Sequence, residues 1–234
     1  MHMIALLTDF GLKDHYVGVM KGVIKKICPE TPVVDVTHGI TPQNILEAGM
    51  RLLQSYPFFP ARTIFVVVVD PGVGSDRAAI AVETEQFVFF APDNGVLAPV
   101  CERERVHAQV KLTRRQYFLS PVSATFHGRD VFAAAAAHHA QGVSLAQLGE
   151  PLKRIHRAAF PVPEVRGARL RGLVCAADRF GNILTNIDTA LISEFLRGGK
   201  NFRAVCMGRE ISGWYRAYAE APEQVPFLII GSSG

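Results

Sequence analysis

One stretch of the chain, VVVVDPGVGSDR at residues 66–77, places an acid and an arginine where they could act together. Four consecutive valines are typical of a strand that is covered on both faces. Such strands deliver side chains to the carboxyl edge of a sheet, where α/β proteins bind ligands, and Pro71-Gly72 forces a sharp exit. We expect Asp70 and Arg77 to meet across this loop. On this stretch alone, a surface turn with a solvated Arg77 remains an alternative.

Other polar residues lie at expected strand ends or in glycine-bearing turns. They are Asp9, Asp14, Asp93, Asn94, His127, Arg129, Asp130, Asp178, Asn182 and Ser232. Buried carboxylates are costly unless they are paired, so several converging acids indicate a site. Each residue alone also has a structural interpretation: turn caps for Asp9 and Asp14, a hairpin turn at Asp93-Asn94, and a core histidine at His127.

A metal site built from Asp9, Asp70, Asp93 and His127 is a second interpretation, since carboxylate and imidazole suit Mg, Mn or Zn. The chain has no HxH, HExxH or DxD pattern, so spacing gives that interpretation little support. GxSxG, GxxxxGK[ST] and a GxGxxG after the first strand are also missing. The acid that opens VDPGVG would repel phosphate, which argues against a phosphate-binding loop.

Composition sets wide bounds. The chain has 234 residues, 49% hydrophobic and 20% charged, with a formal net charge of +4, which permits one large or two smaller globular domains. There is no Lys/Arg block, so nucleic-acid binding is not expected. The four cysteines, Cys28, Cys101, Cys175 and Cys206, have no CxxC spacing and are expected to be reduced. No stretch is long enough for a membrane helix and no leader is recognisable, so we expect a soluble cytoplasmic protein.

The first half of the chain alternates strands and helices. We expect strands at residues 3–8, 33–36 and 66–69, and helices at 16–26 and from about 42 to 56. Asp14 is expected to cap the first helix, and Thr41 the second, before Pro42. This β-α-β-α-β order predicts a parallel sheet with right-handed crossovers. A hairpin at 79–90 and an alanine-rich helix at about 131–140 should follow.

A composition change divides the chain. Residues 158–169 carry two prolines and a glycine with little periodicity, which favours a linker. We therefore expect an N-terminal α/β domain at 1–157 and a smaller β-rich domain at 170–234. The second domain should hold strands near 170–176, 182–186, 202–207 and 227–230 and a helix at 188–196. It ends directly after an apolar strand, so we expect it to be cut short.

Seven stretches together resemble one family. They are LLTDFGLKDHYVGVMKGVI, VVDVTHGITPQN, FVVVVDPGVGSDR, APDNGVL, TFHGRDVFAAAAAH, DRFGNILTNI and the final GSSG. They occur in the family's order and span nearly the whole chain. Together they look like the S-adenosyl-L-methionine (SAM) hydroxide adenosyltransferases, relatives of fluorinase and chlorinase. The resemblance implies an N-terminal α/β domain, a smaller C-terminal β-barrel-like domain, and a homotrimer with active sites between subunits. It also implies hydrolysis of SAM to adenosine and methionine through attack of water on ribose C5′.

The same resemblance implies roles for individual residues. The catalytic set falls on Asp70, Arg77 and His127. The substrate-binding positions fall on Asp9 for the ribose diol, on Asp14, Asp178, Ser232 and Ser233 for the methionine end, on Phe180 and Asn182 for adenine, and on Phe126 beside the sugar. SAM is the substrate in this scheme, and neither a cofactor nor a metal is implied.

Two differences from the halogenating relatives bear on the reaction. Those enzymes have other residues in place of Asp70 and His127. A carboxylate at position 70 would repel a halide. Gln43 stands where fluorinase has a tryptophan beside the ribose. Asp70 favours water as the nucleophile, and Gln43 predicts a less apolar wall beside the ribose. A halide-dependent 5′-halo-5′-deoxyadenosine synthase and a non-catalytic SAM or adenosine binder remain as alternatives.

Overall fold

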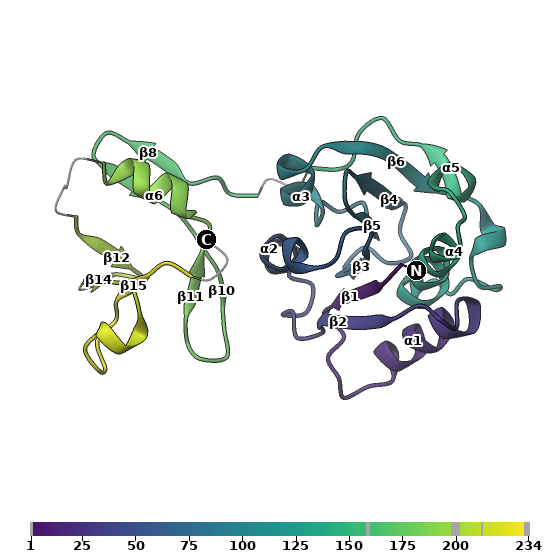
Figure 1. Ribbon diagram of the computed structural model, residues 1–234, viewed down its shortest axis with the longest axis horizontal. Coiled ribbons are helices and arrows are strands. Elements are labelled where there is room, and N and C mark those ends of the chain that lie inside the picture. The colour runs from purple at the N-terminus through teal and green to yellow at the C-terminus, as the bar shows by residue number, and fades with distance from the viewer. Residues whose placement is uncertain (1, 158–159, 198–201, 212, 232–234) are drawn as a thin grey trace. The chain divides into compact units, whose positions relative to one another are not determined.

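The chain folds as two compact units, residues 1–160 and 161–234, shown in Figure 1. This computed structural model describes residues 2–157, 160–197, 202–211 and 213–231.

The first unit is built on one seven-stranded sheet with the order β2-β1-β3-β5-β4-β6-β7. Its strands are β1 (Ile4–Thr8), β2 (Val33–Thr37), β3 (Ile64–Val68), β4 (Ala79–Thr84), β5 (Val88–Pro92), β6 (Val106–Leu112) and β7 (Gly149–Pro151). The pairs β2-β1, β1-β3 and β3-β5 are parallel, as expected. The remaining pairs are antiparallel, because β4 and β5 form the predicted tight hairpin and a short turn joins only antiparallel strands. The sheet is therefore mixed: the predicted parallel β-α-β-α-β segment and the predicted hairpin are both part of it.

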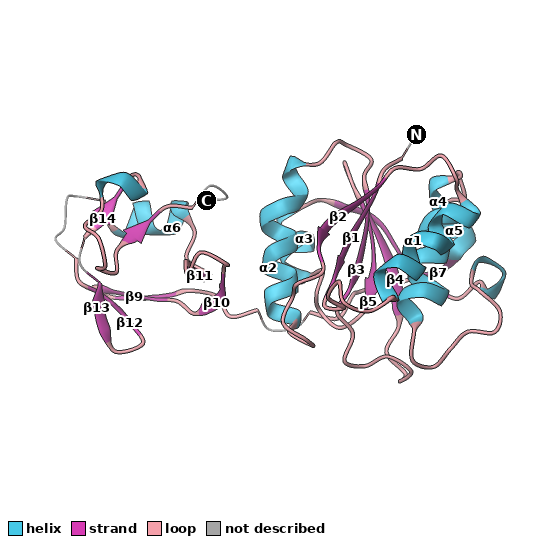
Figure 2. Cartoon of the chain, turned by 90° about the horizontal axis from the view of Figure 1, so that it is seen from below, coloured by secondary structure: helices cyan, strands magenta, loops and turns pink. Residues whose placement is uncertain are grey.

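Helices cover both faces of this sheet. They are α1 (Tyr16–Ile27), α2 (Ile45–Ser55), α3 (Ala98–Arg103), α4 (Ala134–Ala140) and α5 (Leu145–Leu148), with a π-helical turn at Gly128–Ala133 and 3-10 turns at Tyr56–Phe58 and Arg115–Tyr117. Figure 2 shows the sheet edge-on, with α2 and α3 on one side and α1, α4 and α5 on the other. Alternate residues of β1 serve the two cores: Leu6 packs in the cluster of Met20, and Leu7 in that of Leu52. The α/β fold class is confirmed.

Both predicted helix caps were wrong. The first helix has His15 at its N-cap position without a side-chain cap, and Asp14 is exposed. The second helix is capped by Asn44, whose side chain accepts a hydrogen bond from Glu47 N at 3.0 Å. Residues 41–44 form a turn instead, closed by Asn44 N donating to Thr41 O at 3.0 Å. The helix therefore begins three residues after Pro42.

The second unit is β-rich, as predicted. Its elements are β8 (Glu164–Arg166), β9 (Arg169–Arg171), β10 (Val174–Ala177), β11 (Ile183–Thr185), α6 (Thr189–Phe195), β12 (Ala204–Cys206), β13 (Arg209–Ile211), β14 (Trp214–Tyr215), a 3-10 turn at Tyr218–Glu220 and β15 (Leu228–Ile229). The described strands pair two by two and form no closed barrel. Much of the segment expected to be a linker is ordered as the β8-β9 hairpin. Within the described ranges, no helix is long and apolar enough to cross a membrane.

Candidate active site

Asp70 and Arg77 form a buried ion pair just beyond the end of β3. Arg77 Nε donates to Asp70 Oδ1 at 2.9 Å, and Arg77 Nη2 donates to Asp70 Oδ2. The Arg77 side chain is only 10% exposed and the Asp70 side chain 5%, which rules out a surface turn with a solvated arginine. Paired donation to both carboxylate oxygens offsets the cost of removing two charges from water. The predicted contact between Asp70 and Arg77 is confirmed.

His127 joins this pair through the same guanidinium. Arg77 Nη2 lies 2.8 Å from His127 Nδ1. A guanidinium can only donate, so Nδ1 must accept, and the single ring proton of the neutral imidazole resides on Nε2. Burial lowers the pKa of His127, and the charge of Arg77 lowers it further, against opposing effects of Asp70 and Asp130. The site therefore holds a neutral histidine that presents an Nε2–H donor.

A glycine allows the two loops to come this close. Gly74 has φ +80°, and a Cβ on it would lie 2.4 Å from the carbonyl oxygen of Ala124. The Asp70–Arg77 loop therefore packs directly on the backbone that precedes His127, which no larger residue permits. The Arg77 guanidinium also lies 5.4 Å from the ring centroid of Phe132, in the π-helical turn. Contacts to both segments fix the direction of the arginine.

Asn94 holds the backbone just before the acid. Its Nδ2 donates to Val69 O at 2.8 Å, and its Oδ1 accepts from Val96 N at 3.2 Å. Asp93 next to it accepts from His156 N at 2.6 Å. The structure thus uses these two candidates to order loops. The sequence indicated only a turn at Asp93-Asn94 and gave no signal that Asn94 supports the strand end that carries Asp70.

Asp130 and Arg129 also serve the loop around the site. Asp130 is 1% exposed and accepts from Ser123 N at 2.7 Å. Its other oxygen accepts from Arg129 Nε at 2.5 Å. This carboxylate therefore anchors the segment that leads to His127.

Asp9 lies at the same edge of the sheet as Asp70. Thr8 is paired with Val68 in the parallel register of β1 and β3, so the loops that follow these residues start side by side. Asp9 is half-buried, and its Oδ2 accepts a hydrogen bond from Gln43 N at 2.7 Å. Asp14, by contrast, is exposed on the loop before α1.

Phe126 lines an aromatic cavity of about 300 Å³ with Phe10, Tyr16, Ser123, Thr125 and Arg129. The ring of Phe126 meets those of Phe10 and Tyr16 edge to face, at 5.8 and 5.2 Å between centroids. Gly128 packs closely against this aromatic wall. A Cβ on it would lie 3.3 Å from the rings of Phe10 and Phe126. A cavity with aromatic and polar walls is thus lined by the residue that precedes His127 in the chain.

In the second unit, Asp178 and Asn182 organise the turn between β10 and β11. Asp178 Oδ1 accepts from Phe180 N at 2.8 Å and Asn182 N at 2.9 Å, and Oδ2 accepts from Asn182 Nδ2 at 2.6 Å. The turn presents the ring of Phe180, which is 90% exposed. Ser232 and Ser233 lie outside the described residues.

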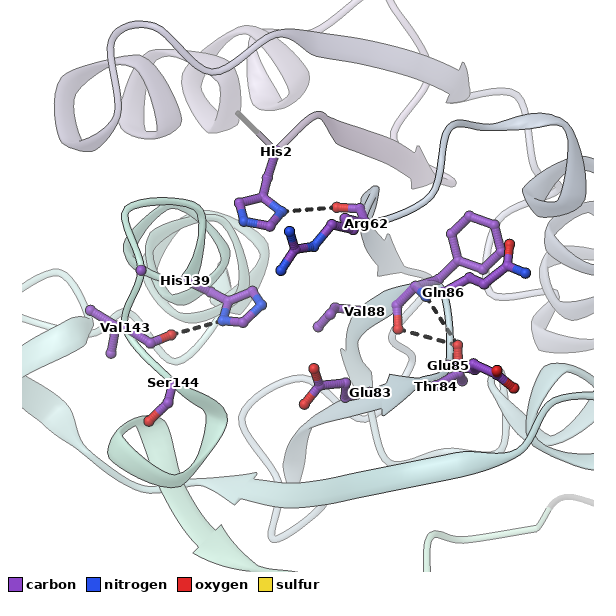
Figure 3. A pocket seen from close by; sticks show the side chains of 12 residues that line it. His2, Arg62, Glu83, Thr84, Glu85, Gln86, Val88, His139, Val143 and Ser144 are labelled. Atoms are coloured by element: carbon purple, nitrogen blue, oxygen red, sulfur yellow. Dashed lines mark hydrogen bonds between the residues drawn. The ribbon is translucent and has the colours of Figure 1, made fainter.

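A second cavity, of about 340 Å³, lies at the opposite edge of the first unit, where the parallel strands begin. Figure 3 shows His2, Arg62, Glu83 and His139 around it. None of the predicted site residues lines this cavity. Within the described part of the chain, no group of three or more His, Cys, Asp or Glu side chains is arranged to hold a metal ion. The grouping of Asp9, Asp70, Asp93 and His127 around one ion was therefore not found.

Comparisons with known proteins match both units of the chain to one family. Residues 4–149 match the SAM hydroxide adenosyltransferase N-terminal domain, and residues 172–234 match the C-terminal domain of that family. A protein from Thermus thermophilus named (R)-S-adenosyl-L-methionine hydrolase is 34% identical over 245 residues, covering 100% of this chain and 90% of the relative. One of the same name from Salinispora tropica is 39% identical over 183 residues, covering 77% and 70%.

Two further matches extend the comparison. A fluorinase from Actinoplanes is 30% identical over 213 residues, covering 79% of this chain and 71% of the relative. The crystal structure of an uncharacterized conserved protein from Thermotoga maritima superposes with a TM-score of 0.92 at 38% identity, covering 99% of this chain and 90% of that one. The two domain matches together span most of the sequence, and the chain belongs to the SAM hydroxide adenosyltransferase family.

Proposed function

We propose that this protein hydrolyses SAM to adenosine and L-methionine. The observation that carries the proposal is the buried Asp70–Arg77–His127 cluster at the carboxyl edge of the sheet, in a chain of this family. Water attacks ribose C5′ in line with the C5′–S bond. The new C5′–O bond forms as the C5′–S bond breaks, the bonding electron pair goes to sulfur, and one proton is released. The sulfonium leaves as a neutral thioether, so it needs no protonation.

The catalytic residues have separate roles in this scheme. Asp70 accepts a hydrogen bond from the water, because each carboxylate oxygen retains acceptor capacity beyond its bond to Arg77. Free water has a pKa of about 15.7, so its proton leaves late in the displacement. Arg77 holds Asp70 ionised and oriented. His127 positions the water through Nε2–H. Holding the water in line with the C5′–S bond lowers the activation barrier by several kcal/mol through proximity.

Substrate binding is assigned within the same proposal. Asp9 binds the ribose diol, and Phe126 lies beside the sugar. Asp14, Asp178, Ser232 and Ser233 contact the methionine end, and Phe180 and Asn182 contact adenine. SAM is the substrate, with no separate cofactor, and the active form is a homotrimer with sites between subunits. Size-exclusion chromatography with light scattering tests the trimer.

The deciding experiment is product analysis. The protein is incubated with SAM in ¹⁸O-labelled water, with and without chloride, and the nucleoside is identified by chromatography and mass spectrometry. Adenosine with ¹⁸O at the 5′ position in both buffers is expected. A chloride-dependent 5′-chloro nucleoside would identify a halogenase. SAM binding without turnover would identify a binder.

A further inference from the structure

We propose that His38 is a positioning residue for Asp9, acting through a line of contacts that runs from the exposed Asp35 through the buried His38 to the buried Thr8. The inference rests on the proposed role of Asp9 in binding the ribose diol. His38 follows β2 and is only 4% exposed, and Thr8 ends β1 and is fully buried. Neither residue belongs to the Asp70–Arg77–His127 cluster.

The contacts form one continuous line between β1 and β2. Thr8 Oγ1 lies 2.8 Å from His38 Nδ1, and His38 Nε2 lies 3.0 Å from Asp35 Oδ1. Lys21 Nζ donates to Asp35 Oδ2 at 2.6 Å. Partial burial alone would raise the pKa of Asp35, but the hydrogen bond from Lys21 and the nearby His38 ring outweigh it and leave the pKa lowered. The line therefore ends on an ionised carboxylate.

One assignment of the protons fits these contacts, with His38 Nε2 meeting Asp35 Oδ1 as a close polar contact that is not aligned as a hydrogen bond. Phe10 N donates to Thr8 Oγ1 at 3.2 Å, which leaves the Thr8 hydroxyl proton for His38 Nδ1. An accepting Nδ1 places the ring proton on Nε2, which faces Asp35. Each donor then points the same way, from Phe10 to Asp35. Hydrogen bonds in such chains polarise and strengthen one another.

This chain controls the loop that carries Asp9. Thr8 Oγ1 accepts a hydrogen bond from Phe10 N, and His38 O accepts one from Gly11 N at 2.8 Å. These two bonds fix the backbone directly after Asp9. The carboxylate itself accepts from Gln43 N at 2.7 Å, on the loop that also begins with His38. Gln43 adopts φ 65°, an uncommon conformation for a residue other than glycine. His38 thus joins the two loops whose separation sets the direction of the Asp9 carboxylate.

The order Asp35–His38–Thr8 also has the form of a nucleophilic triad. The burial of Thr8 excludes that function, because a fully buried hydroxyl that already accepts from Phe10 N has no access to substrate. A positioning role uses the same contacts without requiring access.

Thr8→Val and Thr8→Ser test the chain, because valine keeps the shape and removes the hydroxyl while serine keeps it. Calorimetry measures the affinity of the full-length protein for adenosine and for 2′- and 3′-deoxyadenosine. The wild-type protein should prefer adenosine by about tenfold or more, as expected for hydrogen bonds to a charged group. Thr8→Val should reduce that preference several-fold, and Thr8→Ser should largely restore it. His139→Gln, at the other cavity, should leave it unchanged.

Equal losses of affinity for all three nucleosides in Thr8→Val would show a purely structural role and overturn the inference. If Thr8→Val does not fold, Asp35→Asn replaces it, because the Asp35 side chain is 36% exposed and tolerates the change. It should lower the preference in the same direction, and an unchanged preference would again overturn the inference. Asp9→Asn separates the two proposals: if the preference survives that substitution, the assignment of Asp9 itself is wrong.

Discussion

Arg77 donates from Nη2 to the Nδ1 atom of His127 across 2.8 Å, although the two residues are 50 positions apart in the chain. The same guanidinium also donates to both oxygens of Asp70. One cation thus orients the Asp70 carboxylate and selects a single neutral tautomer of His127.

Asp70→Asn should reduce kcat by about 10²- to 10⁴-fold, the usual effect of removing a general base. KM should stay close to the wild-type value, because the substituted group acts on the water. Steady-state release of adenosine from SAM measures both constants. Asp76→Asn is the matched control, since Asp76 lies exposed in the same loop and should retain full turnover. Unchanged kcat in Asp70→Asn would refute the role of Asp70.

His127 should titrate below its ordinary pKa of 6.5, because burial and the charge of Arg77 both oppose protonation. Arg77→Gln removes that charge and should raise the pKa, while burial keeps it from full recovery. NMR titration of the imidazole measures the change, with Arg62→Gln at the opposite sheet edge as the control. Equal pKa values in the wild type and Arg77→Gln would contradict this electrostatic coupling.

The same shift gives a stability effect with a defined sign. A depressed histidine pKa means that the unfolded chain binds a proton more readily than the folded one. The neutral His127 therefore makes its full contribution to the free energy of unfolding above pH 6.5. That contribution is lost as the pH falls through the lowered pKa of His127. Denaturant unfolding at several pH values, compared between the wild type and His127→Gln, should show a smaller acid-side loss in the variant.

Gly74→Ala should destabilise the first unit and lower turnover, because the new Cβ would meet Ala124 O at 2.4 Å. Gly142→Ala is the matched control: its φ is +103°, but a Cβ there would contact nothing within 4 Å. The control carries only the backbone cost of about 1–2 kcal/mol. Denaturant unfolding and the activity assay compare them. Equal losses of stability in the two variants would show that the loops do not need this close contact.

Phe180→Ala should leave stability unchanged, since the ring is 90% exposed, and should raise KM for SAM. Loss of base stacking on an aromatic ring gives an expected increase of about tenfold. Phe58→Ala, which removes a ring that is 75% exposed in the first unit, should leave KM unaltered. A normal KM in Phe180→Ala would remove Phe180 from the adenine site.

Local patterns in the sequence determined much of the fold. The valine run predicted a buried strand that leads to Asp70, and the three-and-four spacing of Val17, Met20 and Ile24 predicted α1, because burial follows side-chain periodicity. The resemblance to the family grouped Asp70, Arg77 and His127, which the structure places in contact, and apolar runs predicted the strands of the second unit. The caps of α1 and α2 were wrong because several neighbouring polar residues could cap either helix, and backbone turns decided between them.

Tertiary structure decided what depends on contacts between distant segments. The neutral tautomer of His127 follows from a donor in another loop, and the support of Val69 by Asn94 follows from hydrogen bonding across 25 positions. The line from Asp35 through His38 to Thr8 exists only because β1 and β2 are neighbours in the sheet. A sequence specifies which groups are available. Their protonation, direction and burial depend on packing, because hydrogen bonds require a defined geometry between both partners.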